Sequence, residues 1–286
     1  MEQAELKMAR KVIMASPHLP EAICFRVTRY CNAHCGFCLA PNNGVHPNGA
    51  LLAKRIDWLL SRGVRTIHFC GGEPTIHPDL SHLIEHVHHE GGKTRLTTNG
   101  IAISNELISV LRSRRTHVKV SLHGDREHHD KMVGRKAFDQ TTDNLRRLLA
   151  AGVPTSVQTT VVSGGEWVVE WVAAFCREVG VRRLSILPFI PRGDGNVRRE
   201  DYELTVSHRQ SLRRLVSEER KALSGRLDLR WLDFTACPVP VVDADGTVVL
   251  EGATEAMDKV ICRIPGSSQS STDDRRLTTR PLAALK

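Results

Sequence analysis

The sequence predicts an α/β fold in which helices cover a parallel sheet. Short apolar runs alternate with stretches of helical periodicity, so that six strands follow one another with helices between them. Glycines stand just after several of these helices, at Gly63, Gly91-Gly92 and Gly152, where a left-handed residue commonly ends a helix. A chain of 286 residues can form one sizeable domain with a small appendage.

The alternating elements lie within residues 20–190. The predicted strands are Ile23–Thr28, Thr66–Cys70, Arg95–Thr98, Val118–Leu122, Thr155–Val161 and Arg183–Phe189. The predicted helices are Leu51–Leu60, Leu80–His89, Asn105–Arg112, Thr142–Ala150 and Trp167–Val179. Parallel neighbours need a crossover connection, and a helix after each strand provides it.

After Phe189 the alternation stops. The predicted elements there are the helix Ser207–Ser224 and the strands Leu227–Phe234, Val239–Val242 and Thr247–Leu250. The last two strands flank an Asp-Ala-Asp-Gly run, which indicates a hairpin.

The chain thus divides into four parts. These are an N-terminal segment (1–19), the α/β unit (20–190), a C-terminal extension (191–265) and a tail (266–286). The tail has almost no apolar pattern, which is typical of disorder.

Composition limits the possible partners. The net charge is +8, but no aromatic side chains interleave the basic ones, so a solvated basic surface is a better interpretation than nucleic-acid binding. No run approaches the roughly 20 apolar residues that cross a bilayer, and the first 20 residues lack a signal-peptide core. We therefore expect a cytoplasmic protein without a membrane partner, whose eight cysteines are reduced thiols.

Three of these cysteines form a compact motif. Cys31, Cys35 and Cys38 are separated by three residues and then by two, so one loop can hold three corners of a [4Fe–4S] cube and leave the fourth iron open. The alternative is a zinc site with His34 as the fourth ligand. Because His34 directly precedes Cys35, such convergence would strain the loop.

A second motif, Gly71-Gly72-Glu73-Pro74, follows the second predicted strand. Together the two motifs resemble the radical S-adenosylmethionine (SAM) superfamily of the CxxxCxxC type, over roughly residues 20–190. The resemblance implies a partial (β/α)6 barrel, open at one side, with a small α/β C-terminal extension that caps the substrate. It also implies two cofactors, a [4Fe–4S] cluster on Cys31, Cys35 and Cys38, and SAM, whose reductive cleavage releases a 5′-deoxyadenosyl radical.

The resemblance assigns SAM contacts to residues near the two motifs. Phe37 matches a position whose ring flanks adenine, although it can equally pack the loop. Gly71 and Gly72 would let the backbone approach the methionyl end closely. Glu73 would accept a hydrogen bond from the SAM amino group.

Further SAM contacts are implied at later strand ends. Asn99 and Ser121 match positions that touch the ribose and the carboxylate, and Arg135 matches one that pairs with the carboxylate. Leu187 lies where relatives cradle adenine. The chain departs from many relatives at His123, where they have aspartate; this histidine can face substrate or cap its strand.

The remaining cysteines raise the question of how a substrate radical is resolved. Cys24, Cys70 and Cys176 are expected to pack in the core. Cys237 and Cys262 resemble the start of an extension that holds auxiliary clusters, but two cysteines are too few for a second cluster. A free thiol can instead return a hydrogen atom to a carbon radical, and we expect Cys262, or else Cys237, to do so.

This layout resembles the radical SAM epimerases of aminoglycoside and peptide natural products, a group typified by neomycin C epimerase. The implied activity is epimerisation of an aminoglycoside, another sugar or a peptide in antibiotic biosynthesis. The alternatives are a dehydrogenase or carbon-skeleton enzyme of secondary metabolism, or a nucleotide- or RNA-modifying enzyme. The expected partners are a small-molecule natural product and an electron donor, either a reductase or a flavodoxin or ferredoxin.

Overall fold

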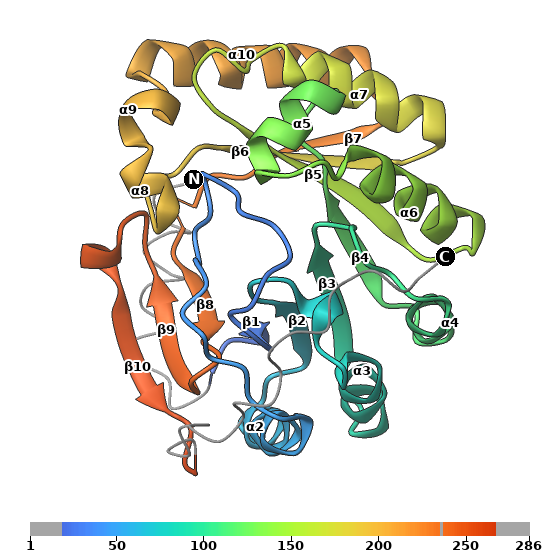
Figure 1. Ribbon diagram of the computed structural model, residues 1–286, viewed down its shortest axis with the longest axis vertical. Helices are drawn as coiled ribbons and strands as arrows, with labels where there is room; N and C mark the ends of the chain where they lie inside the picture. The colour runs from blue at the N-terminus through green and yellow to red at the C-terminus, as the bar shows by residue number, and fades with distance from the viewer. Residues whose placement is uncertain (1–18, 235–236, 267–286) are drawn as a thin grey trace.

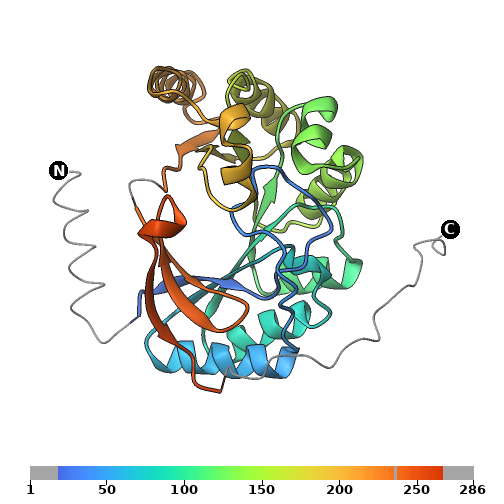
Figure 2. The same cartoon turned by 60° about the vertical axis from the view of Figure 1, so that its left-hand side comes forward.

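One sheet of ten strands organises the computed structural model, which describes residues 19–234 and 237–266. Seven parallel strands run in sequence order: β1 (Ala22–Arg26), β2 (Thr66–Cys70), β3 (Lys93–Thr98), β4 (His117–Ser121), β5 (Thr155–Val161), β6 (Arg183–Pro188) and β7 (Asp228–Trp231). On the other side of β1 lie β8 (Val239–Val242), β9 (Thr247–Glu251) and β10 (Lys259–Arg263). The sheet curves, and β7 and β10 are its two edges (Figures 1 and 2).

Helices surround the convex side of this sheet (Figure 1). They are α2 (Gly49–Ser61), α3 (Leu80–His89), α4 (Asn105–Ser113), α6 (Phe138–Ala150), α7 (Val168–Val179) and α10 (Val206–Ala222). The helices α5 (Arg126–Val133), α8 (Asp194–Val197) and α9 (Arg199–Tyr202) instead contact the loop that follows β1. Local signals begin and end the surrounding helices: Asn48 and Ser104 accept the N–H groups of Leu51 and Leu107 at the starts of α2 and α4, and Gly180 ends α7 at φ 84°.

The two faces of the barrel strands have different characters. Successive side chains of a strand point to opposite sides, so Phe25 and Phe69 face the helices and are fully buried in the main core. The residues that alternate with these phenylalanines along β1 and β2, such as Cys24 and His68, face the inside of the barrel. The helix-facing side is therefore apolar, whereas the strand residues on the inside include polar ones such as His68, Thr97 and Lys119.

The fold class predicted from the sequence is confirmed, and the differences have physical reasons. A seventh parallel strand, β7, pairs with β6, and β8 pairs in parallel with β1, so the extension adds strands beside both ends of the six-stranded unit. The helix α5 was missed because its sequence is dominated by polar residues, and α8 and α9 are single turns. The antiparallel strand β10 was also missed.

Two expectations fall outside the described residues. The N-terminal segment lies almost wholly in residues 1–18, and the expected tail lies in residues 267–286. Among the helices that the structure describes, none combines the length and apolar character needed to cross a bilayer.

Candidate active site

The loop that carries the three cysteines follows β1 at the carboxyl ends of the parallel strands, and it is drawn in blue in Figures 1 and 2. The turn after β2 holds its first part: the N–H groups of Gly72 and Glu73 donate to the carbonyl oxygens of Thr28 and Tyr30, both at 2.8 Å. A Cβ atom on Gly72 would lie 2.0 Å from the Tyr30 oxygen. Gly72 therefore allows two backbone segments to meet directly before Cys31.

The middle of the loop rests on α5. The His34 N–H donates to the Val133 carbonyl at 2.9 Å, and a Cβ atom on Gly134 would lie 2.5 Å from the His34 oxygen. The Arg135 guanidinium donates to the Asn32 carbonyl. In this structure Arg135 thus holds the cysteine loop, and its expected pairing with the SAM carboxylate stays a prediction.

The end of the loop is held from the other side of the barrel. The Asp194 N–H donates to the Cys38 carbonyl at 3.0 Å, and a Cβ atom on Gly193 would lie 2.4 Å from the same oxygen. Gly36 packs against the ring of Tyr202. The turn after β2, the end of α5 and the segment with α8 and α9 therefore fix the backbone around all three cysteines.

The donor set fits a cube better than a single ion. Within the part of the chain that the structure describes, no three His, Cys, Asp or Glu side chains are close enough together to hold one metal ion. In a cube each thiolate binds a different iron, so the sulfur atoms need not converge on one point. This arrangement fits a cluster on Cys31, Cys35 and Cys38 and not the zinc alternative.

The electrostatics of the three thiols show what a bound cluster would have to supply. Burial raises the pKa of Cys31 to about 11, and it raises the pKa of Cys35 and Cys38 as well. Cys38 and Cys31 add to the rise at Cys35 because a neighbouring thiolate disfavours a second one. Bound iron would supply the positive charge that keeps all three deprotonated.

Glu73 is completely buried and joins two strand ends. Its Oε1 accepts from the Thr75 N–H at 3.0 Å and from the Thr75 and Thr98 hydroxyls at 2.7 Å, and its Oε2 accepts the Asn99 N–H at 2.7 Å. Burial raises the pKa of Glu73, although these bonds oppose the rise. Oε2 can still accept another donor, so the expected bond to the SAM amino group stays a prediction.

Asn99 connects the end of β3 to the cysteine loop. Its amide donates to Asn32 Oδ1 at 2.7 Å and lies 3.9 Å from Cys31 Sγ. Ser121 is the last residue of β4, half-buried. The structure therefore brings Asn99 to the loop, while the SAM contacts of Asn99 and Ser121 stay predictions.

A cavity of about 290 Å³ opens between the loop and the inside of the barrel. Five of the expected residues line it: Cys35, Phe37, Cys38, Gly71 and Leu187. Its deeper wall is polar and includes His68, Thr97, Lys119 and Gln158. This cavity is the candidate active site, since it joins the cysteine loop to a polar barrel interior.

The structure does not bring Cys262 to this cavity. Cys262 of β10 pairs with Val248, Val248 with Val242, and Val242 with Phe25. Cys262 packs with these residues against the helix-facing core. The pleat turns its side chain to the other face of the sheet, and its expected role as hydrogen donor stays a prediction that this placement does not support.

Cys237, the second expected donor, is exposed and is not among the residues that line the cavity. It stands beside residues 235–236, which are outside the described part of the chain. Its role stays a prediction.

Sequence reasoning missed two cysteines that do line the cavity, Cys24 and Cys70. Cys24 Sγ lies 4.0 Å from His68 Nδ1, and His68 Nε2 lies 2.7 Å from the Thr97 hydroxyl. A hydrogen bond with Cys70 lowers the pKa of the Cys24 thiol and raises that of Cys70. The alternation of apolar and polar residues in both strands was the signal that could have placed these thiols inside.

Buried ion pairs line the cavity on the side of the C-terminal extension. Arg26 donates to both carboxylate oxygens of Glu251 at 2.7 and 2.8 Å, and Arg192 donates to both oxygens of Asp258 at 2.7 and 2.6 Å. Arg192 also lies 3.2 Å from Glu251. Arg26 ends β1, Arg192 follows β6, Glu251 ends β9 and Asp258 precedes β10. The pairs therefore connect the barrel to the C-terminal extension.

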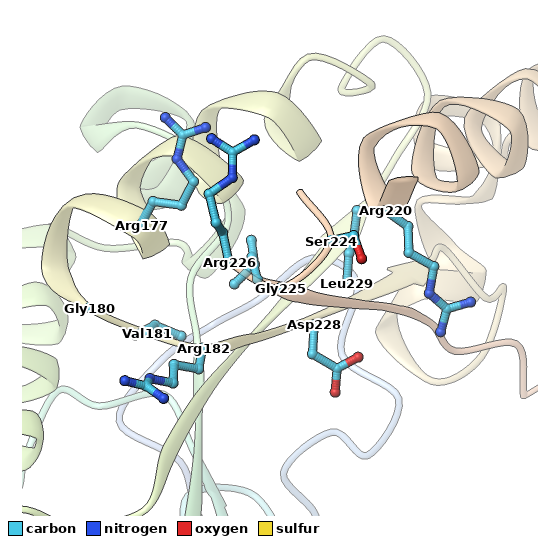
Figure 3. A pocket seen from close by; sticks show the side chains of 11 residues that line it. Arg177, Gly180, Val181, Arg182, Arg220, Ser224, Gly225, Arg226, Asp228 and Leu229 are labelled. Carbon is cyan, nitrogen blue, oxygen red and sulfur yellow. The ribbon is translucent and has the colours of Figure 1, made fainter. Parts of the chain in front are cut away.

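A second hollow, of about 830 Å³, lies at the opposite end of the barrel, where β6 and β7 begin. Arg177, Arg182, Arg220 and Arg226 line it, and their guanidinium groups do not converge on one point (Figure 3). It is remote from the cysteine loop, so it is not the candidate active site.

Two buried histidines beside the cavity are held neutral. His123, edge-on to Phe37 with centroids 4.8 Å apart, accepts the Thr160 N–H at Nδ1, and His129 accepts the His123 N–H at Nδ1. Burial lowers the pKa of His129 to about 4 and lowers that of His123 too. Each ring therefore carries its proton on Nε2.

Acid should destabilise the protein through these histidines. An unfolded histidine binds a proton below about pH 6.5, whereas His129 in the fold does so only near pH 4. The unfolded state binds more protons between these values, so the free energy of unfolding should fall as the pH drops through this window, by about 1.4 kcal/mol per unit for each such histidine. Urea unfolding of the apoprotein across the window measures this. His129→Gln should show a shallower dependence, and an unchanged slope would contradict the assignment.

The chain belongs to the Radical SAM superfamily, whose family model matches residues 25–175. That range includes the cysteine loop, the turn after β2 and the strand ends described above. The superfamily uses a [4Fe–4S] cluster and SAM, so the two cofactors inferred from the motifs are confirmed.

Relatives and solved structures agree with this assignment. Fe-coproporphyrin III synthase of Methanosarcina barkeri is 28% identical over 222 residues, which cover 75% of this chain but 55% of that protein. The PqqA peptide cyclase of Streptomyces rochei is 25% identical over 260 residues, covering 87% and 71%. The chain thus spans about half the length of the first relative.

Two solved structures share the fold. Streptococcus suis SuiB has a TM-score of 0.67 at 16% identity, covering 86% of this chain and 64% of SuiB. The structure of anSMEcpe with bound AdoMet has a TM-score of 0.68 at 18% identity, covering 81% and 74%. These likenesses confirm the α/β barrel architecture.

Proposed function

We propose that this chain is a radical SAM epimerase in which Cys70 returns a hydrogen atom to the substrate. The observation that carries this proposal is a pair of thiols, Cys24 and Cys70, in the wall of the cavity that the cysteine loop also lines. When bound, the cluster and SAM supply a radical that removes a hydrogen atom from the substrate. A thiol on another side of the same cavity can then deliver hydrogen to the opposite face of the substrate carbon.

Cys70 is the better donor of the two. A hydrogen atom can leave only from a protonated thiol, and Cys70 keeps its proton because the bond to Cys24 and partial burial both raise its pKa. Cys24 is the hydrogen-bond acceptor, stabilised by Cys70 and His68. Cys24 is therefore placed to stabilise the sulfur radical that Cys70 becomes.

The transfer balances with an external reductant. The S–H bond of Cys70 breaks, a C–H bond forms on the inverted carbon, and a thiyl radical remains on Cys70. One electron and one proton then restore the thiol. We propose a flavodoxin or ferredoxin with its reductase as the source of this electron and of the electron that the cluster needs.

The substrate class follows from the relatives and from the cavity. One relative is named a PqqA peptide cyclase, which supports a peptide substrate here. The polar wall of the cavity also suits a sugar. Dehydrogenation is the second candidate. It begins with the same removal of a hydrogen atom, but the substrate radical then loses an electron and a proton instead of gaining a hydrogen atom.

The test uses anaerobically reconstituted protein, SAM and reductant with peptide and sugar candidates. A candidate that stimulates 5′-deoxyadenosine formation is then converted in deuterated water. We expect one deuterium at the inverted carbon, because the Cys70 proton exchanges with solvent. Cys70→Ala should still form 5′-deoxyadenosine, yet lose inverted product at least ~100-fold, as expected when a hydrogen-transfer group is removed.

Cys262→Ala is the matched control, because it removes the same type of side chain from the other face of the sheet, and it should retain inversion. Cys237→Ala tests the remaining cysteine. Inverted product without deuterium, or full inversion by Cys70→Ala, would contradict the proposal. A product two hydrogens lighter, with about eight irons per chain, would instead establish dehydrogenation.

A further inference from the structure

Lys119 is a cation of the cavity without an ion-pair partner among the described residues, although the Cys24 thiol is near enough to raise its pKa. Three basic side chains line the cavity: Arg26, Arg192 and Lys119. The two arginines pair with Glu251 and Asp258. Lys119 makes no hydrogen bond or ion pair to residues 19–234 or 237–266.

A second unmatched polar group stands beside it. Lys119 of β4 is in register with Thr97 of β3 and Ser156 of β5, and parallel partners point to the same side of a sheet. Ser156 is fully buried, and its hydroxyl has no partner among the described residues. Buried polar groups without partners are costly, but Ser156 is not among the residues that line the cavity, so the unpaired ammonium of Lys119 is the group that indicates a place for a ligand.

The surroundings decide the charge of that ligand. Arg95, Arg183 and Arg230 are close enough to add to the effect of burial, which lowers the pKa of Lys119; only Cys24 acts in the opposite direction. Burial and Arg183 likewise lower the pKa of His117 to about 4. Asp228 pairs with Arg183 and Arg230, so Lys119 and Arg95 supply the positive charge that attracts an anion and repels a polyamine.

We propose that Lys119 binds an anionic group of the substrate, a carboxylate or a phosphate, deep in the barrel. The inference rests on the proposed function, because it takes this cavity as the substrate site. Lys119 is two residues before Ser121, roughly 7 Å deeper in the barrel than the strand end where SAM is expected. The substrate is therefore an acidic peptide or an anionic sugar and not a polycationic aminoglycoside.

The test needs no turnover. Melting temperatures of the reconstituted protein are measured in chloride, acetate and inorganic phosphate at constant ionic strength. We expect Lys119→Met to melt roughly 2 °C or more above the unmodified protein in chloride, because it removes an unmatched charge. It should also lose the additional stabilisation that acetate or phosphate confers. Lys136→Met, at an exposed position, should retain that stabilisation.

The anion that raises the melting temperature more, acetate or inorganic phosphate, indicates whether the site binds a carboxylate or a phosphate. A lower melting temperature for Lys119→Met would overturn the proposal, because Lys119 would then compensate a charge of the protein itself, with Cys24 the nearest. Anion stabilisation that persists in Lys119→Met would also overturn it. Failure of the deuterium experiment leaves this result unaffected, so the two proposals fail separately.

Discussion

Replacing Gly72 with alanine should abolish cluster assembly. The new Cβ would lie 2.0 Å from the Tyr30 carbonyl oxygen and 2.8 Å from the Arg29 carbonyl carbon, which are backbone atoms that cannot rotate away. The turn after β2 would separate from the loop, and Cys31, the next residue after Tyr30, would move. Iron content and the visible absorbance of the reconstituted protein should fall at least ~10-fold, together with 5′-deoxyadenosine formation, because misplacement by about 1 Å already disables such sites.

Gly91→Ala provides the matched control. Gly91 has a positive φ of 76°, which Gly72 does not, and a Cβ atom there would meet nothing within 4 Å. This variant should lose about 1 kcal/mol of stability from backbone strain and keep its cluster. A full iron content in Gly72→Ala would show that the contact between the two backbones does not position Cys31.

Replacing Glu251 with glutamine should cost about 3–5 kcal/mol of unfolding free energy. Arg26 and Arg192 both lie against Glu251, and the three side chains are 8–14% exposed. Loss of the carboxylate leaves Arg26 with only the more distant Asp243, at 3.6 Å. Urea unfolding measures the change, and this wall of the cavity should loosen with it.

Two further comparisons test the Arg26–Glu251 ion pair. One replaces both partners together, and the other replaces one partner of an exposed ion pair. Arg26→Met combined with Glu251→Leu should cost less than the two single changes added together, because no uncompensated charge remains. Asp139→Asn removes the exposed partner of Arg126 and should leave the unfolding free energy nearly unchanged. Equal losses for Glu251→Gln and Asp139→Asn would show that the buried pairs do not hold the extension.

The cysteines show how far sequence reasoning reached. Cys31, Cys35 and Cys38 were recognised because their ligand spacing is a local property of one loop. Cys262 was chosen because it is unpaired and near the C-terminus, and neither property says which way a side chain points. Cys70 was assigned to packing, although it alternates with Phe69 along β2 and so faces the cavity.

The residues alone were sufficient for the parallel α/β fold and a cluster on three cysteines, because periodicity, glycine stops and ligand spacing act over short distances along the chain; SAM was implied by the resemblance that the two motifs carry. The partners of these local features were decided only in three dimensions. Strand register turned Cys70 and Lys119 inward and Cys262 outward, and packing placed Arg26 against Glu251, 225 residues away. Such contacts depend on which strands become neighbours, and burial then sets the charge and the reactivity of each group.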